Sequence, residues 1–225
     1  MYSVALIGPD GAGKTTLTRR LEASGLLPFR YIYMGVNAEA SNIALPTVRL
    51  VQRLKSRAGA EPVAAAEPGG TQGSGRVTRR ATDVARLANR FADEWFRQAV
   101  SWYYQARGYI VLYDRHFVFD FAFEIAEGQE SWDRRVHRWL LQRLYPRPSL
   151  VIFLDASGEV LYHRKGESSV KELERRRQAF LRQSPAIRHF VLVDATRPLD
   201  VVYDEVVAHI VRHVNDHGRL RHCDA

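Results

Sequence analysis

The sequence has very little cysteine, few lysines and no long apolar run, and each scarcity excludes a class of protein. The one cysteine, Cys223, cannot form an intrachain disulfide, and we therefore expect a reducing, cytoplasmic setting. No apolar run approaches the ~18–20 residues that cross a bilayer, so we expect no membrane span. Residues 1–7 carry no basic segment and lead directly into Gly8, which is typical of a strand entering a turn rather than of a signal peptide.

Arginine carries most of the positive charge, since only four of the 33 basic residues are lysines, and the net charge is +8. Three interpretations fit this excess: a solvated arginine-rich surface, an anionic small substrate, or a nucleic acid. Guanidinium groups bind phosphate with two parallel hydrogen bonds, which suits the second interpretation. Nucleic acid is the least favoured of the three, and it is the motifs below that lead us to expect a small-molecule phosphate acceptor.

Apolar β-rich segments alternate with amphipathic segments along the chain. Strands are predicted at residues 2–7, 29–34, 109–113, 150–154 and 190–193. Helices are predicted at residues 14–24, 45–57, 79–107, 131–144, 159–183 and 199–214. This alternation predicts an α/β fold of three layers, in which a mostly parallel sheet is covered by helices on both faces.

One domain, residues 1–225, is expected from a composition that is 46% hydrophobic and 26% charged. Within it, residues 59–78 are predicted to be a mobile loop, because residues 59–75 are rich in Ala, Pro, Gly and Ser. Gly108 is expected to end the long helix before it as the first residue beyond the cap.

Residues 8–15 read Gly-Pro-Asp-Gly-Ala-Gly-Lys-Thr and match G-x-x-x-x-G-K-[ST] at every fixed position. Such a loop wraps tightly, so that backbone N–H groups and the start of the following helix point at phosphate oxygens. Lys14 would reach the β- and γ-phosphates, and the Thr15 hydroxyl would bind Mg²⁺. The pattern therefore predicts a site for ATP and Mg²⁺. Its expected residues are Gly8, Asp10, Gly11, Ala12, Gly13, Lys14, Thr15 and Thr16.

Three further segments follow this loop in a recognisable order. Asp-Arg-His at 114–116 ends a strand, a basic stretch at 163–177 follows Leu-Asp at 154–155, and Val-Asp-Ala-Thr-Arg-Pro-Leu stands at 193–199. With Asp10 at the third position of the loop, these segments resemble the thymidylate-kinase-like branch of the nucleoside monophosphate kinases. The resemblance covers residues 4–211. It implies a P-loop NTPase fold, a basic helical lid at 159–183, and a homodimer packed through helices.

Asp114 ends a buried strand, where a carboxylate would hold Mg²⁺ through water together with Thr15. Arg115 beside it would present its guanidinium to the acceptor phosphate. The resemblance implies that Asp10 faces the acceptor sugar, and that Arg197 lies in the loop beside adenine.

The lid supplies the remaining expected catalytic cation. Some family members carry an arginine at the fourth position of the loop, where this chain has Gly11. That departure moves the expected cation to the basic lid, with Arg164 as the preferred residue. The expected catalytic residues are therefore Lys14, Asp10, Arg115 and Arg164.

The acceptor site departs most from the family pattern. The family's Arg-Glu-Pro-Gly-Gly-Thr segment is missing after the second strand, and Glu-Pro-Gly-Gly-Thr at 67–71 follows an alanine in a stretch that we interpret as linker. The family places an aromatic ring and an arginine on the long helix, and Arg90 and Phe91 are the corresponding candidates. With Asp10 and Arg115 they form the expected acceptor site, although aromatic residues at helical spacing are also typical of a core.

The resulting expectation is an ATP- and Mg²⁺-dependent phosphotransferase acting on a (deoxy)nucleoside monophosphate, with dTMP as the leading candidate. A P-loop kinase of a sugar or lipid-linked acceptor is the first alternative, favoured by the missing acceptor motif and the aromatic residues at 116–121. A nucleotide-binding regulatory protein is the second, favoured by the Ala/Pro/Gly-rich loop. A nucleic-acid-binding ATPase is a weaker third, and would lose affinity steeply with salt.

Overall fold

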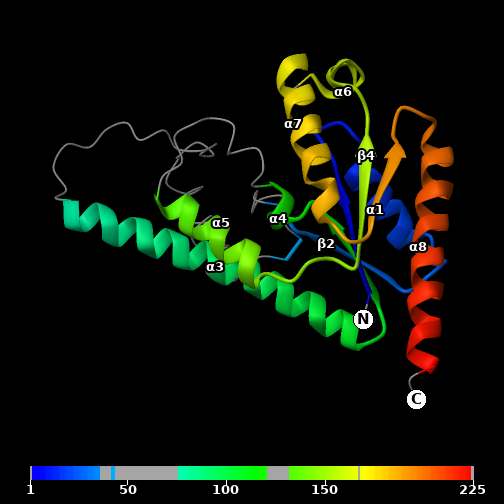
Figure 1. Ribbon diagram of the computed structural model, residues 1–225, viewed down its shortest axis with the longest axis horizontal. Helices are drawn as coiled ribbons and strands as arrows, with labels where there is room; N and C mark the ends of the chain where they lie inside the picture. Colours follow the sequence, from blue (N-terminus) through cyan, green and yellow to red (C-terminus); the bar gives the residue numbers. More distant parts are fainter. Residues whose placement is uncertain (1, 36–41, 44–75, 121–131, 167, 224–225) are drawn as a thin grey trace.

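Five parallel strands form the centre of the molecule (Figure 1). The computed structural model describes residues 2–35, 42–43, 76–120, 132–166 and 168–223. The strands are β1 (Tyr2–Ile7), β2 (Phe29–Tyr33), β3 (Ile110–Asp114), β4 (Leu150–Asp155) and β5 (Phe190–Asp194). They pair in the order β2-β3-β1-β4-β5, and every described pairing is parallel. The predicted α/β architecture with a parallel sheet is confirmed.

Helices cover both faces of this sheet. They are α1 (Lys14–Ala23), α3 (Arg76–Ala106), α4 (Phe117–Asp120), α5 (Trp132–Leu144), α6 (Gly158–Lys165), α7 (Val170–Gln183), a 3-10 turn (Ser184–Ala186) and α8 (Leu199–Cys223). In Figure 1, α1 and α8 lie on one side of the strands, while α3 and α5 run side by side and extend away on the other.

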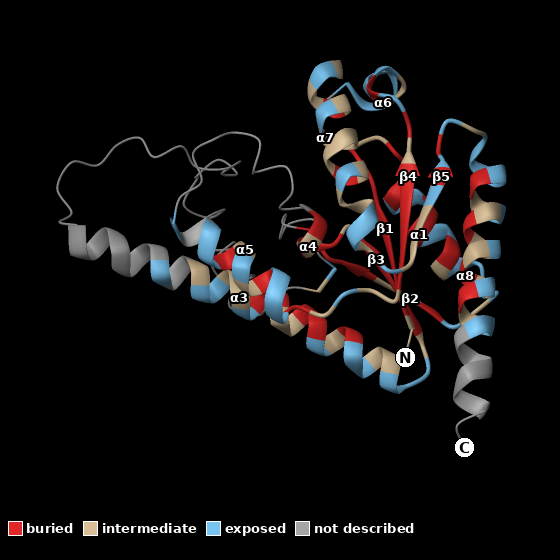
Figure 2. Cartoon of the chain, in the orientation of Figure 1, coloured by how far each residue is buried: buried red, intermediate tan, exposed pale blue. Residues whose placement is uncertain are grey.

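Alternate residues along each strand face two separate hydrophobic clusters, which Figure 2 shows as buried strands between partly exposed helices. Val4 and Leu6 of β1 pack in a cluster that also holds Leu17 of α1. Ala5 and Ile7, the intervening residues, pack in the cluster that holds Leu141 of α5. Because successive side chains of a strand point to opposite faces, this division is what three layers require.

The segment 159–183, predicted as one helix, is two helices, and the prediction of a continuous helix is wrong there. α6 ends at Gly166, which has a φ of 69° and so occupies the left-handed region that ends many helices. Ser169 then begins α7 by accepting a hydrogen bond from the backbone N–H of Glu172 at 3.3 Å. The glycine and the capping serine are the local causes of the break.

Other boundaries also move. Residues 76–78 belong to α3 rather than to the predicted mobile loop, α8 continues nine residues beyond the predicted end at 214, and α4 was not predicted. Gly108 has a φ of 86° just after α3, as predicted. The helix predicted at 45–57 and most of the loop at 59–78 lie outside the described residues. No helix in the described part of the chain is both long and apolar enough to cross a membrane.

The winding of the sheet reverses at β1, which lies between β3 and β4. The chain first moves to the β2 and β3 side and then crosses to β4 and β5, and such a reversal leaves a crevice at the carboxyl ends of the strands. The loop after β1 lies at this edge, and the register pairs Leu6 with Asp114 at the end of β3. The fold thus brings the glycine-rich loop, residues 8–15, next to Asp114.

Candidate functional site

The glycine-rich loop, residues 8–15, connects β1 to α1 and needs its glycines for steric reasons. Gly8 has a φ of 147°, and a Cβ there would lie 2.7 Å from the carbonyl oxygen of Leu154. Gly13 has a φ of 90° and occupies the N-cap of α1, where it has no side chain to cap the helix. The first turn of α1 contains no acidic residue. Its N–H groups therefore form an anion-binding position.

Lys14 folds its side chain back over this loop. Its Nζ donates hydrogen bonds to the carbonyl oxygens of Gly8 at 2.8 Å and Pro9 at 2.7 Å, and the residue is only 5% exposed. A positive charge is thereby held inside the curve of the loop. Of the other predicted loop residues, Ala12 is buried and Thr16 is exposed. Gly11 lies against α6, since a Cβ there would be 3.1 Å from the Leu161 carbonyl oxygen.

Asp114 lies fully buried opposite the start of α1. Its Oδ2 accepts hydrogen bonds from the Thr15 hydroxyl at 2.5 Å and from the Tyr31 hydroxyl at 3.3 Å. Its Oδ1 has no hydrogen-bond partner among the described residues. Burial and the negative charge of Asp114 raise the pKa of Tyr31, so this hydroxyl stays a donor.

These oxygens fit a magnesium ion. Mg²⁺ prefers hard oxygen ligands, and it commonly takes one or two carboxylates with the remaining positions filled by water and substrate phosphates. Thr15 and Asp114 offer a hydroxyl and a carboxylate with one unsatisfied oxygen. The described residues contain no group of three or more His, Cys, Asp or Glu side chains placed to hold a metal by themselves. The donor set therefore suits an ion that arrives with a phosphate ligand.

Asp10 holds two guanidinium groups from different elements. Arg115 donates from Nη2 to its Oδ1, and Arg176 of α7 donates from Nη1 to its Oδ2 at 3.1 Å. Burial alone would raise the pKa of Asp10, but the charges of Arg115, Lys14 and Arg176 outweigh it, and the pKa is lowered. Arg115 adopts a φ of 66°, unusual for a residue with a side chain, while its N–H bonds the Leu6 carbonyl at 3.1 Å.

Arg176 is one of several basic residues in the predicted lid, and the sequence did not single it out. The preferred lid cation, Arg164, lies exposed near the end of α6, whereas Arg176 reaches Asp10. The signal was present in the periodicity: Leu173 and Phe180, three residues before and four after Arg176, are the buried residues of α7. Residues at these spacings share one face of a helix, so Arg176 is on the inward face.

A second arginine of α7 binds the end of β4. Arg177 pairs with both oxygens of Asp155, through Nε at 2.5 Å and Nη2 at 2.9 Å, and its Nη1 reaches Glu174 at 2.9 Å. These hydrogen bonds raise the pKa of the Arg177 guanidinium. Two consecutive arginines thus connect α7 to carboxylates at the carboxyl edge of the sheet.

Of the two predicted acceptor residues on α3, Phe91 contacts α5, whereas Arg90 pairs with a residue of α3 itself. Arg90 lies with Nε 3.5 Å from Glu94 Oε1, and the ring of Phe91 is 6.0 Å from Trp95 and 6.5 Å from His137, measured between ring centroids. These ring contacts agree with the alternative that aromatic side chains on this helix pack against neighbouring helices.

Arg97, one heptad after Arg90, approaches the site more closely. This residue is 1% exposed, pairs with Asp93, and donates to the Gly35 carbonyl at 2.9 Å. Gly35 in turn abuts Arg115, since a Cβ on Gly35 would lie 2.7 Å from the Arg115 Cδ. Arg97 therefore fixes the backbone against which Arg115 lies.

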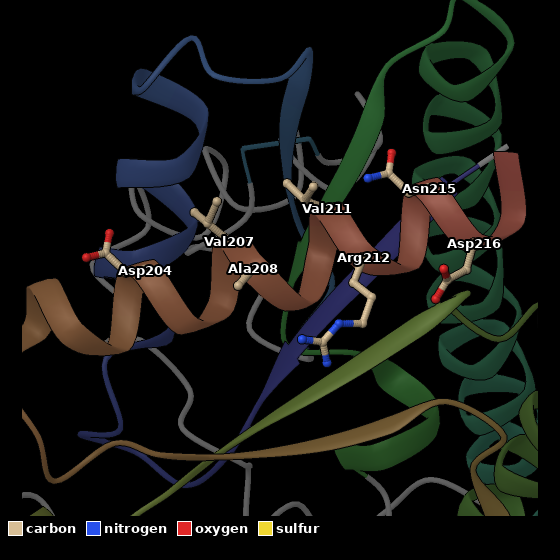
Figure 3. Close-up of a pocket in the computed structure, with 7 residues that line it drawn as sticks. All are labelled: Asp204, Val207, Ala208, Val211, Arg212, Asn215 and Asp216. Atoms are coloured by element: carbon tan, nitrogen blue, oxygen red, sulfur yellow. The ribbon is translucent and has the colours of Figure 1, made fainter. Parts of the chain in front are cut away.

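Arg197 lies in the connection between β5 and α8. Its Nε donates to the Asp194 carbonyl at 3.2 Å, and its Nη2 pairs with Glu205. A separate hollow lies along α8 (Figure 3), and all its lining residues belong to that one helix: Asp204, Val207, Ala208, Val211, Arg212, Asn215 and Asp216. This hollow includes no residue of the glycine-rich loop, β3 or α7.

Neither the models of known protein families nor the curated proteins include a match to this chain.

Proposed function

We propose that this chain is an ATP- and Mg²⁺-dependent phosphotransferase with the P-loop NTPase fold. One observation carries the proposal: the glycine-rich loop, residues 8–15, faces the buried carboxylate of Asp114. One oxygen of this carboxylate accepts a hydrogen bond from the Thr15 hydroxyl, and the other has no hydrogen-bond partner among the described residues. Loop amides, a lysine, a hydroxyl and a carboxylate are together the groups that bind a triphosphate and its metal.

Lys14 and the N–H groups at the start of α1 would hold the β- and γ-phosphates. To do so, the Lys14 ammonium exchanges the Gly8 and Pro9 carbonyls, at 2.8 and 2.7 Å, for phosphate oxygens. Thr15 and Asp114 would hold Mg²⁺, which when bound neutralises negative charge on the phosphates. Because phosphoryl transfer requires mainly positioning and cations, no strong general base is needed.

Arg115 and Arg176 would hold the acceptor phosphate and the transferred group. Both now bind Asp10, whose carboxylate occupies the place of an anion between them. An incoming phosphate would compete for the same two guanidinium groups, and bidentate arginine–phosphate bonds are well suited to that exchange. Asp10 would then be released to orient the acceptor. Arg164, exposed on α6, remains a second lid cation in this proposal.

The acceptor phosphate oxygen would attack the γ-phosphorus of ATP, and the bond to the bridging oxygen would break to leave ADP. A nucleoside monophosphate, with dTMP first, remains the proposed acceptor, and the compartment that we propose is the cytoplasm. A sugar or lipid-linked acceptor is the second candidate, because Arg90 pairs with Glu94 within α3 and the ring of Phe91 packs against His137 of α5.

The test is ADP release from MgATP in the presence of dTMP, dUMP, CMP or AMP. We expect one nucleotide to stimulate ADP release far above the rate without acceptor, and Arg115→Ala to weaken acceptor use much more than ATP binding. If none stimulates release while ATP still binds, the nucleotide-kinase proposal is wrong, and the non-nucleotide and regulatory alternatives gain. If ATP does not bind at all, the loop assignment itself fails.

A further inference from the structure

α5 presents an apolar ridge to solvent. Trp132, Val136 and Trp139 are spaced by four and three residues, which places them on one face of a helix. They are 49%, 40% and 56% exposed, whereas His137 and Leu141 on the opposite face are each 1% exposed. Figure 2 shows exposed segments along α5 on the part of the molecule that extends away from the sheet. Two half-exposed tryptophans on one ridge need an explanation, since large apolar side chains usually mark a contact surface when they gather.

Positive charge lies beside this ridge and at its end. Arg135 is exposed and falls to one side of the ridge on the helical wheel, and Arg143 is exposed and continues the ridge one turn beyond Trp139. In the sequence, α5 carries four arginines and one aspartate. A partner that covers the ridge would therefore have an apolar interior and a negatively charged rim.

Exposed aromatic residues are also present on α3, the helix against which α5 packs. Trp102 and Tyr103 of α3 are 42% and 52% exposed, and the Arg107 guanidinium lies 4.8 Å from the centre of the Tyr103 ring. Trp102 contacts Trp95, which in turn contacts Tyr145 just after α5, with centroids 6.0 and 5.8 Å apart. Tryptophan, tyrosine and arginine thus gather on the helices that extend away from the sheet.

We propose that this face of α5 binds the surface of an anionic phospholipid bilayer. An interfacial helix inserts an apolar ridge rich in tryptophan to the level of the headgroups, while arginines beside the ridge meet lipid phosphates. A second copy of the chain fits less well, because a two-fold contact centred on Val136 would bring Arg135, which lies beside the middle of the ridge, close to its own copy. A nucleic acid fits less well, because three apolar side chains occupy the face and only its end carries a cation in line with them, Arg143.

The test is sedimentation of the full chain with vesicles of phosphatidylcholine alone or mixed in equal parts with phosphatidylglycerol. We expect binding to the anionic vesicles at least ~10-fold stronger than to the neutral ones, with a blue shift of tryptophan fluorescence. Trp132→Ala/Trp139→Ala should lower the partition coefficient at least ~10-fold, by removing the inserted ridge. Arg135→Glu/Arg143→Glu should lower it by ~20-fold or more, because each cation near an anionic surface contributes about fivefold.

Two matched double variants serve as controls. Leu26→Ala/Leu199→Ala removes exposed apolar side chains and Arg188→Glu/Arg212→Glu reverses exposed charges, all of them away from α5. Both should bind within twofold of the unaltered chain. Circular dichroism of every variant checks that it folds.

Three results would overturn the proposal. Binding that does not distinguish anionic from neutral vesicles removes the role of the arginines. Absence of vesicle binding, with a dimer in sedimentation velocity that Trp132→Ala/Trp139→Ala dissociates, assigns the ridge to a second copy. Absence of vesicle binding, with salt-sensitive binding of single-stranded oligonucleotides that the same variant weakens, assigns it to nucleic acid.

Discussion

Two groups of charged side chains in this molecule are alike in chemistry and different in burial. At the carboxyl edge of the sheet, Asp10 pairs with Arg115 and Arg176, and these side chains are 20–29% exposed. Between α3 and α5, Glu94 pairs with His137 at 2.7 Å, and both are at most 2% exposed. The first group joins the glycine-rich loop, the residue after β3 and α7, and the second joins two helices along their packed faces.

The difference in burial indicates a difference in role. A partly exposed ion pair contributes little to stability, because water already solvates both charges well. It can therefore exchange one partner for a ligand at small cost. A buried pair has lost that solvation, and removing one partner leaves an uncompensated charge in the interior. We infer that the Asp10 group serves binding and that the Glu94 pair holds α5 on α3.

The largest effect is expected from Lys14→Ala, which removes a cation close to Asp10. Phosphoryl transfer should fall by on the order of 10³-fold, because the charge that stabilises the transferred phosphates is lost. Because Lys14 is buried and donates to two carbonyls, the variant should also unfold more easily, by ~1–3 kcal/mol. Steady-state ADP formation and urea unfolding measure the two effects.

Lys171→Ala is the matched control, since Lys171 is an exposed lysine of α7. It should keep both activity and stability. Full turnover by Lys14→Ala would show that the glycine-rich loop does not bind the transferred phosphate.

The comparison itself is tested by Glu94→Ala against Asp10→Ala. We expect the loss of Glu94 to lower the free energy of unfolding by ~3–5 kcal/mol, because His137 is left in an apolar interior without its partner. Asp10→Ala should lower it by less than ~1 kcal/mol, as for other partly exposed pairs. Urea unfolding of both variants gives the two values directly. Equal losses would mean that burial does not separate the two groups.

Some residues of the charged site could be predicted from the sequence, and others could not. The loop at 8–15 and Asp114 were predictable because a local motif and a strand end define them, and parallel strands bring their carboxyl ends together. Arg176 was not, because several basic residues crowd one segment; the spacing of Leu173 and Phe180 puts Arg176 on the inward face of α7 but does not show that it reaches Asp10. The contact of Arg97 with Gly35 spans 62 residues and has no local signal.

The fold was more predictable than its details. The periodicity of apolar residues gave every described strand within one residue at either end, since buried strands have sharp hydrophobic limits. The predicted helix ends were wrong where the true ends depend on capping or on solvent-exposed turns. α8, for example, continues to Cys223 through a mostly polar segment that has no apolar periodicity. α4 has four residues, too short for periodicity to reveal.

Arg176→Ala tests whether the arginines bound to Asp10 serve catalysis rather than stability. It should lower kcat by ~10²-fold, because a cation near the transferred group is lost, while the free energy of unfolding changes by less than ~1 kcal/mol. Arg175→Ala, which alters the exposed neighbouring residue, is the control and should change neither. Comparing Arg164→Ala in the same assay decides between the two lid cations: a larger loss with Arg164→Ala would restore the expectation from the sequence.

A pH dependence of intermediate size is expected from His116, which is fully buried among aromatic rings. Burial lowers its pKa to about 3, whereas an unfolded histidine titrates near 6.5. The unfolded chain therefore binds a proton that the folded chain excludes, and stability falls as the pH decreases through this window. From pH 7 to pH 5 the group should cost ~2 kcal/mol.

Unfolding of His116→Phe at both pH values measures that contribution. The apolar ring fills the same aromatic surroundings and cannot bind a proton, so the decrease in stability between pH 7 and pH 5 should be smaller by ~2 kcal/mol. An unchanged decrease would mean that His116 does not control the acid sensitivity.

The smallest effect concerns Asp114. It tests whether a buried carboxylate always has a structural role, as we infer for Glu94. Asp114 is as buried as Glu94, yet it lies at the carboxyl edge with one oxygen that no described residue satisfies. Tyr31→Phe removes the weaker hydrogen bond to Asp114, 3.3 Å long, and should change the Mg²⁺ concentration for half-maximal activity about fivefold. Tyr2→Phe removes a comparable 3.4 Å bond to the Val214 carbonyl and should leave it unchanged. If Tyr31→Phe alters stability but not the Mg²⁺ requirement, Asp114 has a structural role like that of Glu94. The side chains that exchange partners for a ligand are then only Asp10 and its two arginines.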